Sequence, residues 1–299
     1  MKLFAATVIA LGVLGLSAEA SAFCRSTTCR STGAKECATD QDSCPAEGAK
    51  LYWPTSCINF AFNQQGTQDL DPEETFAVMR KTFQAWTEVQ CAKGGQATIT
   101  FEERGPVLLK KSEYNKDGRN VNVILFQDDD WKYRGIDGTL AKTSVTYNDE
   151  TGEIYDADIE VNAANNTVTL PESKRVEYDL QAIMTHEIGH FIGIAHSSDE
   201  SAVMAPTYSP GSIAQRKLSA DDVAAVCAIY PPKSGLVCAP EPRGGFGDED
   251  PNATNPKACA VSSGVGSGAL PVAALTIMGL GVLGAARRAR RRTDLGRRS

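Results

Sequence analysis

The alternation of apolar and polar positions predicts a single α/β domain over residues 51–232. Short runs rich in β-branched and aromatic residues, bounded by Gly, Asn or Asp, indicate strands. Helix starts are marked by Asp71 with Pro72 and by Ser219 with Asp222, which are capping patterns. The predicted strands are 51–63, 97–103, 120–127, 139–147 and 154–161, and the predicted helices are 71–90, a helix from about 177, and 219–230. A stretch of this length is large enough to bury one sizeable core.

The three histidines of the chain all lie within residues 186–196. His186 and His190 are four positions apart, so on a helix their imidazoles face the same metal ion. If the helix continued, His196 would lie roughly 9 Å further along its axis, too far to share an ion whose bonds to nitrogen are about 2 Å. Gly193 can end the helix, because glycine adopts the left-handed conformation at little steric cost. The chain then turns back and presents His196 as a third ligand.

A site of three neutral imidazoles leaves a fourth position for water, which is typical of a catalytic zinc ion. Glu187 lies beside His186 and can act as the general base that accepts a proton from the attacking water. A five-residue version of this motif arises by chance in unrelated proteins, where the histidines are ordinary core residues. The longer version with a third histidine is far more specific, and it predicts metal-assisted peptide hydrolysis.

The residues after the histidines narrow this interpretation. Ser197 follows the third histidine directly, and Met204, Pro206 and Tyr208 form a Met-x-Pro-x-Tyr pattern. With the run 218–232, this combination resembles the metzincins and, among them, the matrixins. The resemblance implies an α/β (α+β) metzincin fold, a twisted mixed sheet with one helix before the active-site helix and a C-terminal helix after it. It also implies that Met204 underlies the metal ligands, and that Pro206 to Tyr208 form a wall of the pocket for the substrate side chain after the cut bond.

The chain departs from animal matrixins in its other metal-binding residues. Gly138 to Lys142 resembles the stretch where those enzymes place a histidine for a second, structural zinc, and no histidine remains here for such a site. We therefore expect one catalytic Zn²⁺. Calcium is a second hypothesis, since carboxylates are suitable ligands, and the alternative is a solvated acidic surface. The candidate calcium ligands are Asp156, Asp158 and Glu160 on one predicted strand and the run Asp128, Asp129 and Asp130.

Residues 1–22 predict a secretory signal peptide. Lys2 precedes an apolar stretch, and Ala20 to Ala22 supply small residues for cleavage. The mature chain is then expected to begin at Phe23. A lipoprotein beginning at Cys24 is the alternative, although Phe23 is a poor residue for the preceding position.

Export changes the interpretation of the nine cysteines. In an oxidising environment an even set favours disulfides, so we expect four bridges and a separate Cys259. Residues 23–50 form a short cysteine-rich N-terminal segment that is too small to fold without such links. Zinc binding by its cysteines is the alternative. This segment lacks the Arg-Cys-Gly motif of the matrixin prosegment, so latency by that switch is not expected, and a switch by one of the early cysteines is the alternative.

The C-terminal part resembles a myxobacterial-type sorting tail. Residues 233–268 are expected to be a linker containing Cys259, 269–286 an apolar transmembrane segment, and 287–299 an arginine-rich cytoplasmic tail. Residues 51–232 are expected to be the metzincin catalytic domain. Because positive residues stay on the cytoplasmic side, this domain would face outward. The alternatives are a permanent single-span anchor and release from the cell.

Charge limits the partners of the exported region. The formal net charge is −7 although the last residues are arginine-rich, so the rest of the chain is more acidic still. Such a surface argues against nucleic acid as a partner. We expect a monomeric, secreted or surface-anchored zinc endopeptidase that acts on protein or peptide substrates. A surface adhesion module that retains the zinc-protease scaffold is the alternative, although such a module would not need Glu187.

Overall fold

The computed structural model describes residues 22–31, 36–133 and 139–247. These residues belong to the first of two units into which the chain divides, Met1–Ala253 and Thr254–Ser299. Signal residues 1–21, Cys259 and the predicted transmembrane and cytoplasmic segments lie outside the described residues. Among the residues that are described, none of the helices combines the length and apolar character that a membrane span requires.

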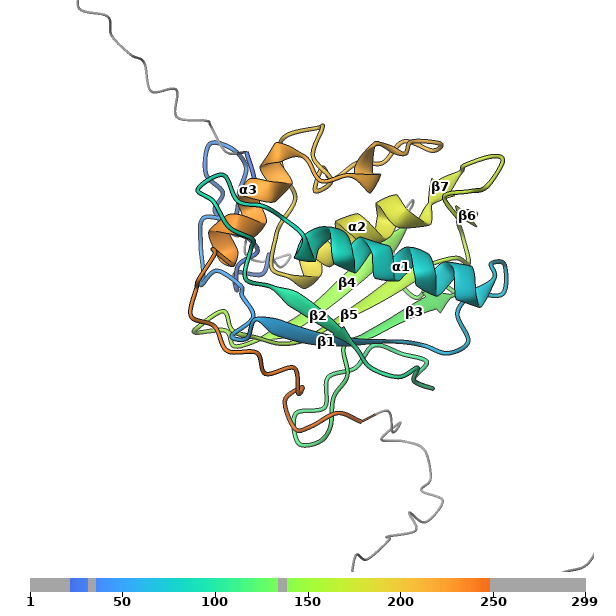
Figure 1. Ribbon diagram of the computed structural model, residues 1–299, viewed down its shortest axis with the longest axis horizontal. Helices are drawn as coiled ribbons and strands as arrows, with labels where there is room; N and C mark the ends of the chain where they lie inside the picture. Colours follow the sequence, from blue (N-terminus) through green and yellow to red (C-terminus); the bar gives the residue numbers. More distant parts are fainter. Residues whose placement is uncertain (1–21, 32–35, 134–138, 248–299) are drawn as a thin grey trace, which may run out of the picture. The chain divides into compact units, whose positions relative to one another are not determined.

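A five-stranded mixed sheet with the order β2-β1-β3-β5-β4 organises the domain. Neighbouring strands are parallel except for β4, which runs antiparallel to β5 at one edge. Helices α1 and α2 lie across one face of this sheet (Figure 1). The elements are β1 (Cys57–Phe62), α1 (Pro72–Thr87), β2 (Thr100–Glu103), β3 (Val123–Gln127), β4 (Ala141–Tyr147), β5 (Ile154–Asn162), β6 (Val168–Thr169), β7 (Tyr178–Asp179), α2 (Leu180–Phe191), η1 (Ala214–Arg216) and α3 (Ala220–Ile229). The predicted mixed sheet and the order of its helices are confirmed.

Helix boundaries follow side-chain caps. The Asp71 carboxylate accepts a hydrogen bond at the start of α1, and Ser219 forms a capping box with Asp222 at the start of α3. Helix α2 begins at Leu180, later than predicted, because Tyr178–Asp179 pairs as β7 with β6. The Asp179 carboxylate then accepts from the backbone N–H of Ala182 at 2.8 Å and caps the helix.

The apolar core lies between the sheet and the helices. Trp86 of α1 is fully buried, and its indole N–H donates to the carbonyl of Thr185 in α2 at 3.0 Å. Phe83 stacks on Phe60 of β1 with ring centroids 3.9 Å apart and meets Phe191 of α2 edge-on. These contacts fix the position of α2, the helix that carries the first two histidines, on the sheet.

The face of the sheet opposite the helices carries buried polar residues on β5. Asp156, Asp158 and Glu160 are each at most 2% exposed, so they do not form a solvated acidic surface. Glu160 forms an ion pair of 2.8 Å with Lys132 and accepts hydrogen bonds from neighbouring side chains, and Asp158 accepts from the Val123 N–H at 2.8 Å. These carboxylates hold the connecting segments against the sheet through hydrogen bonds of the protein itself, and calcium binding here stays a prediction.

Asp156 differs from its neighbours because its Oδ1 has no hydrogen-bond partner among the residues that the structure describes. Burial raises its pKa from 3.8 to about 8. The folded state therefore keeps a proton that the unfolded state releases near pH 4, and stability falls as the pH rises from about 4 to about 8. We expect Asp156→Asn to remove the contribution of residue 156 to this dependence, with a gain in unfolding free energy that is larger at pH 8.5 than at pH 5.5 by on the order of 3 kcal/mol.

Urea unfolding of the wild type and the variant at both pH values measures this difference. Asp149→Asn, at an exposed position, is the matched control and should follow the wild type. Parallel stability profiles for Asp156→Asn and the wild type would contradict the expectation.

Four disulfides confirm the expected number of bridges and exclude zinc binding by the N-terminal cysteines. They join Cys24 to Cys44, Cys29 to Cys37, Cys57 to Cys238, and Cys91 to Cys227.

The N-terminal segment is paired with the chain that follows α2. The Ser26 N–H donates to the Gly193 carbonyl at 3.0 Å, and the Ala195 N–H donates to the Cys24 carbonyl at 2.9 Å. The cysteine-rich segment thus lies against the stretch that leads to His196.

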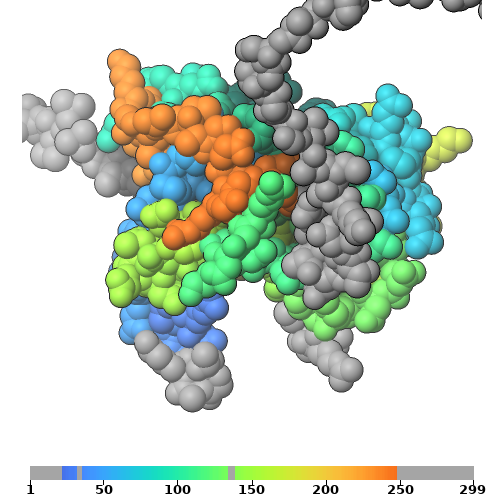
Figure 2. All heavy atoms as spheres, turned by 90° about the horizontal axis from the view of Figure 1, so that it is seen from below, coloured from blue at the N-terminus to red at the C-terminus, as the bar shows by residue number. Residues whose placement is uncertain are grey.

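Residues 233–247 are attached to the domain, whereas the sequence predicted that a linker begins at residue 233. The Cys57–Cys238 bridge anchors them near the start of β1, and the Thr55 hydroxyl donates to the Val237 carbonyl at 2.9 Å. Further along, the Asn120 N–H donates to the Gly245 carbonyl at 3.0 Å. Figure 2 shows this orange segment beside the green segment around residue 115. Covalent and backbone contacts of this kind extend the domain to at least residue 247.

Candidate metal centre and active site

Three histidines meet in one cluster. His186 and His190 project from α2 and His196 from the segment that follows, with ring centroids between 4.8 and 5.2 Å apart. Their candidate ligand nitrogens all lie within 4.8 Å of one another. Within the described ranges, this is the one group of three or more His, Cys, Asp or Glu residues close enough to hold a metal ion.

Gly193 brings His196 to this cluster. Helix α2 ends at Phe191, and Gly193 has φ of 93°, in the left-handed region that glycine adopts without strain. A Cβ at this position would also lie only 2.8 Å from the Leu51 carbonyl oxygen. Both the turn and the close approach of residue 51 therefore require glycine.

Backbone carbonyls orient two of the imidazoles. His186 Nδ1 lies 2.7 Å from the Val203 carbonyl oxygen, and His190 Nδ1 lies 2.9 Å from that of Ile194. A carbonyl can only accept, so each Nδ1 carries the proton and each Nε2 is free to bind a metal. Burial, with the neighbouring histidines, lowers the pKa of His190 well below its usual value and that of His196 to about 4. Neutral imidazoles are the form that zinc requires.

The turn that contains Met204 packs beneath α2. Met204 is 1% exposed, and its side chain fills the space beside Gly189, where a Cβ would collide with it. Its backbone N–H and that of Val203 donate to the Asp222 carboxylate at 3.1 and 2.9 Å. Asp222 is thus both part of the α3 capping box and the anchor of this turn.

Glu187 lies on the strand side of the histidine cluster. Its side chain is 7% exposed, and its Oε2 accepts a hydrogen bond of 2.6 Å from the Thr143 hydroxyl on β4. Burial raises the pKa of the Glu187 carboxyl, whereas the charge of His186 and the bond from Thr143 oppose that rise.

The sequence profile of the matrixin family matches residues 52–231, more than half of the chain. The chain belongs to the matrixin family. Matrixins use a catalytic zinc ion, and three imidazole nitrogens on a helix and the following turn are a donor set that fits it. His186, His190 and His196 are the residues that would hold this ion.

Several curated matrix metalloproteinases are similar to part of this chain. Metalloendoproteinase 1-MMP of Arabidopsis thaliana is 30% identical over 191 residues, which cover 62% of this chain and 46% of that protein. Matrix metalloproteinase-C of Caenorhabditis elegans is 32% identical over 196 residues, covering 62% and 30%. Human matrilysin is 48% identical over 50 residues, covering 17% and 19%. The chain therefore spans less than half the length of these relatives.

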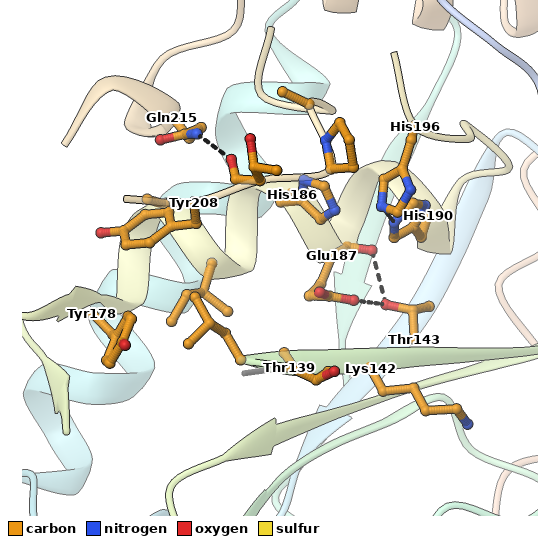
Figure 3. A pocket seen from close by; sticks show the side chains of 17 residues that line it. Thr139, Lys142, Thr143, Tyr178, His186, Glu187, His190, His196, Tyr208 and Gln215 are labelled. Atoms are coloured by element: carbon orange, nitrogen blue, oxygen red, sulfur yellow. Dashed lines mark hydrogen bonds between the residues drawn. The ribbon is translucent and has the colours of Figure 1, made fainter. Parts of the chain in front are cut away.

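A cavity of about 690 Å³ opens beside the histidines of this matrixin (Figure 3). It is bounded by edge strand β4, by α2 and by the segment 205–208, and it includes Pro206 and Tyr208 in its wall. The Tyr208 hydroxyl donates to the Ser212 carbonyl at 2.6 Å and accepts from the Asp179 N–H at 3.0 Å, which fixes its ring. Gln215 of η1 closes one end.

The structure thus brings together Glu187, the three histidines, Pro206 and Tyr208, and it places Met204 and Gly193 in supporting positions. Sequence reasoning missed Thr143 and the second role of Asp222. Lys142, where a structural zinc would need histidine, lies with Nζ 4.1 Å from the centre of the Tyr133 ring and donates to the Ser144 hydroxyl at 2.6 Å.

Proposed function

We propose that this matrixin is an exported, monomeric zinc endopeptidase that cuts internal peptide bonds of protein substrates. In this proposal His186, His190 and His196 hold the zinc ion, and Glu187 is the general base. This proposal rests on one observation: the histidine cluster and the Glu187 carboxylate line the same cavity. An adhesion module would need neither the carboxylate nor a cavity beside it.

The edge strand supports the binding of an extended peptide. Strand β4 is the last strand of the sheet order, so within the described ranges one side of it has no partner strand. A peptide can add to such an edge through main-chain hydrogen bonds and direct alternate side chains into pockets. Leu140 and Ala141 of this region line the cavity, so the added peptide would run past Glu187 with one side chain inside the cavity.

The protein residues perform the proton transfers. When bound, zinc would supply Lewis-acid activation of the water and of the peptide carbonyl. Glu187 accepts the proton of the attacking water on a carboxylate oxygen and then gives it to the nitrogen of the leaving amine. The burial that raises the pKa of Glu187 favours the protonated form between these two transfers. The carbonyls of Val203 and Ile194 keep two imidazoles oriented throughout.

Cleavage of a mixed peptide library by the purified, oxidised protein tests this proposal. We expect cuts inside peptides, loss of cutting after chelation, and recovery on return of zinc. Zinc binding without any cleavage would instead favour the binding-module hypothesis.

Ala182 is expected to set the depth of the specificity pocket. This small residue of α2 lines the cavity and is 1% exposed, and Tyr178 and Tyr208 line the same cavity. Ala182→Phe should fill that space and lower kcat/KM about 10- to 100-fold for peptides with a large apolar residue after the cut bond. Peptides with alanine there should be affected much less.

Cut-site frequencies in the same library measure this shift. Ala228→Phe, at an exposed position of α3, is the control that adds the same ring elsewhere. Equal losses for large and small residues in Ala182→Phe would contradict a role in specificity.

We also propose that the chain is exported through residues 1–22 and attached at the cell surface through the apolar segment 269–286 and the arginine-rich tail 287–299. The four disulfides support an oxidising location. The apolar run followed by arginines supports the sorting tail. Fractionation of cells that make the full chain or residues 1–253 tests this. The full chain should stay with the envelope and the shortened chain should reach the medium.

A further inference from the structure

Thr143 is a polar residue at an apolar position of β4. Residues 141, 143 and 145 of this strand face α2, because side chains alternate along a strand. Ala141 belongs to the apolar core and Val145 packs against it. Between them the alternation calls for another apolar side chain, yet the chain carries a hydroxyl.

The contacts of this hydroxyl lead to Glu187. Thr143 Oγ1 lies 2.6 Å from Glu187 Oε2 and 3.1 Å from the Glu187 carbonyl oxygen (Figure 3). A threonine hydroxyl has one proton, and 2.6 Å is the length of a hydrogen bond to a charged carboxylate. The proton therefore goes to Oε2, and the carbonyl oxygen receives the weaker contact.

This bond leaves the two carboxylate oxygens unequal. Oε2 accepts the Thr143 hydroxyl and is held against β4, whereas Oε1 accepts from no side chain among the described residues, and Glu187 lines the cavity. A glutamate side chain has several rotatable bonds, so one strong contact at its tip selects one orientation among many.

We propose that Thr143 is a positioning residue that holds Glu187 with Oε2 on the strand and Oε1 directed to the reacting water. The inference rests on the proposed role of Glu187 as base. Because Thr143 lies on the edge strand proposed to receive the peptide, the element that binds the substrate also orients the base.

Thr143→Val tests this inference, because valine keeps the shape and removes the hydroxyl. We expect kcat on a peptide substrate to fall about 10- to 100-fold, the scale of a misplaced catalytic group, with KM changed by less than about 2-fold. Zinc content should stay at the wild-type level. Thr143→Ser returns the hydroxyl without the methyl group and should restore most of kcat.

Thr146→Val is the matched control. Thr146 lies on the same strand, and its hydroxyl makes no hydrogen bond among the described residues, so its kcat should equal that of the wild type. Thermal unfolding of each variant checks that the domain is folded. If Thr143→Val does not fold, Thr143→Ala and Thr143→Ser are compared in its place.

Two results would overturn the inference. One is a wild-type kcat in Thr143→Val, and the other is a low kcat that serine does not restore, which would indicate a packing role. Glu187→Ala distinguishes these two results from a failure of the proposed function. If Glu187→Ala is active, Glu187 is not the general base, and the proposed function itself is wrong.

Discussion

Replacing His190 by alanine is expected to remove zinc and peptide hydrolysis together. The three rings form a nearly equilateral triangle, in which the ring centroid of His190 lies 4.8 Å from each of the other two. Its loss leaves two nitrogens, one of them on the segment after α2. Even changes around metal ligands lower affinity 10- to 100-fold, so we expect zinc affinity to fall by more than about 100-fold.

Metal analysis after dialysis against a weak chelator measures this loss beside the cleavage rate. Gln84→Ala, on the exposed side of α1, is a control that should keep both. Stoichiometric zinc in His190→Ala would show that the assigned ligand set is wrong.

Replacing Glu187 by alanine is expected to abolish peptide hydrolysis while zinc stays bound. The carboxylate does not belong to the histidine cluster, so zinc should stay bound within a few-fold of the wild-type affinity. Without a base, kcat should fall about 10²- to 10⁴-fold. Glu187→Gln, which keeps the size and the Thr143 contact, should lose activity to a similar extent.

Single-turnover cleavage and zinc titration on the same preparations measure the two effects. Full activity of Glu187→Ala with its zinc retained would refute the proposed mechanism. Simultaneous loss of zinc would show instead that this carboxylate contributes to metal binding.

Local signals predicted most of the fold. Asp71 with Pro72 and Ser219 with Asp222 mark real helix starts, because a cap bonds to backbone groups only three positions away. The start of α2 was predicted too early, since residues 178–179 pair with β6 before the helix begins. The order of the strands and the disulfide partners depend on contacts between distant residues. The Cys57–Cys238 bridge, for example, joins positions 181 residues apart.

The same distinction applies to the site. His186, His190 and His196 were predictable because helix geometry and one glycine determine their spacing. Thr143 was not, because it meets Glu187 across 44 residues and only the packing of β4 on α2 brings them together. The acidic residues of β5 were expected as calcium ligands or a solvated surface. They are buried beneath segments whose position no local pattern reveals, so the solvated surface is wrong and calcium binding stays a prediction.

The pairing of residues 24–26 with 193–195 makes metal binding and the N-terminal segment thermodynamically linked. Zinc held through His196 favours the folded turn, and that turn is hydrogen-bonded to residues 24–26, which the Cys24–Cys44 bridge holds in place. Linkage is reciprocal. If the Cys24–Cys44 bridge raises the affinity for zinc, bound zinc stabilises the bridge against reduction by the same free energy. Reductant and chelator would then act on this enzyme as cooperating agents, each lowering the concentration at which the other takes effect.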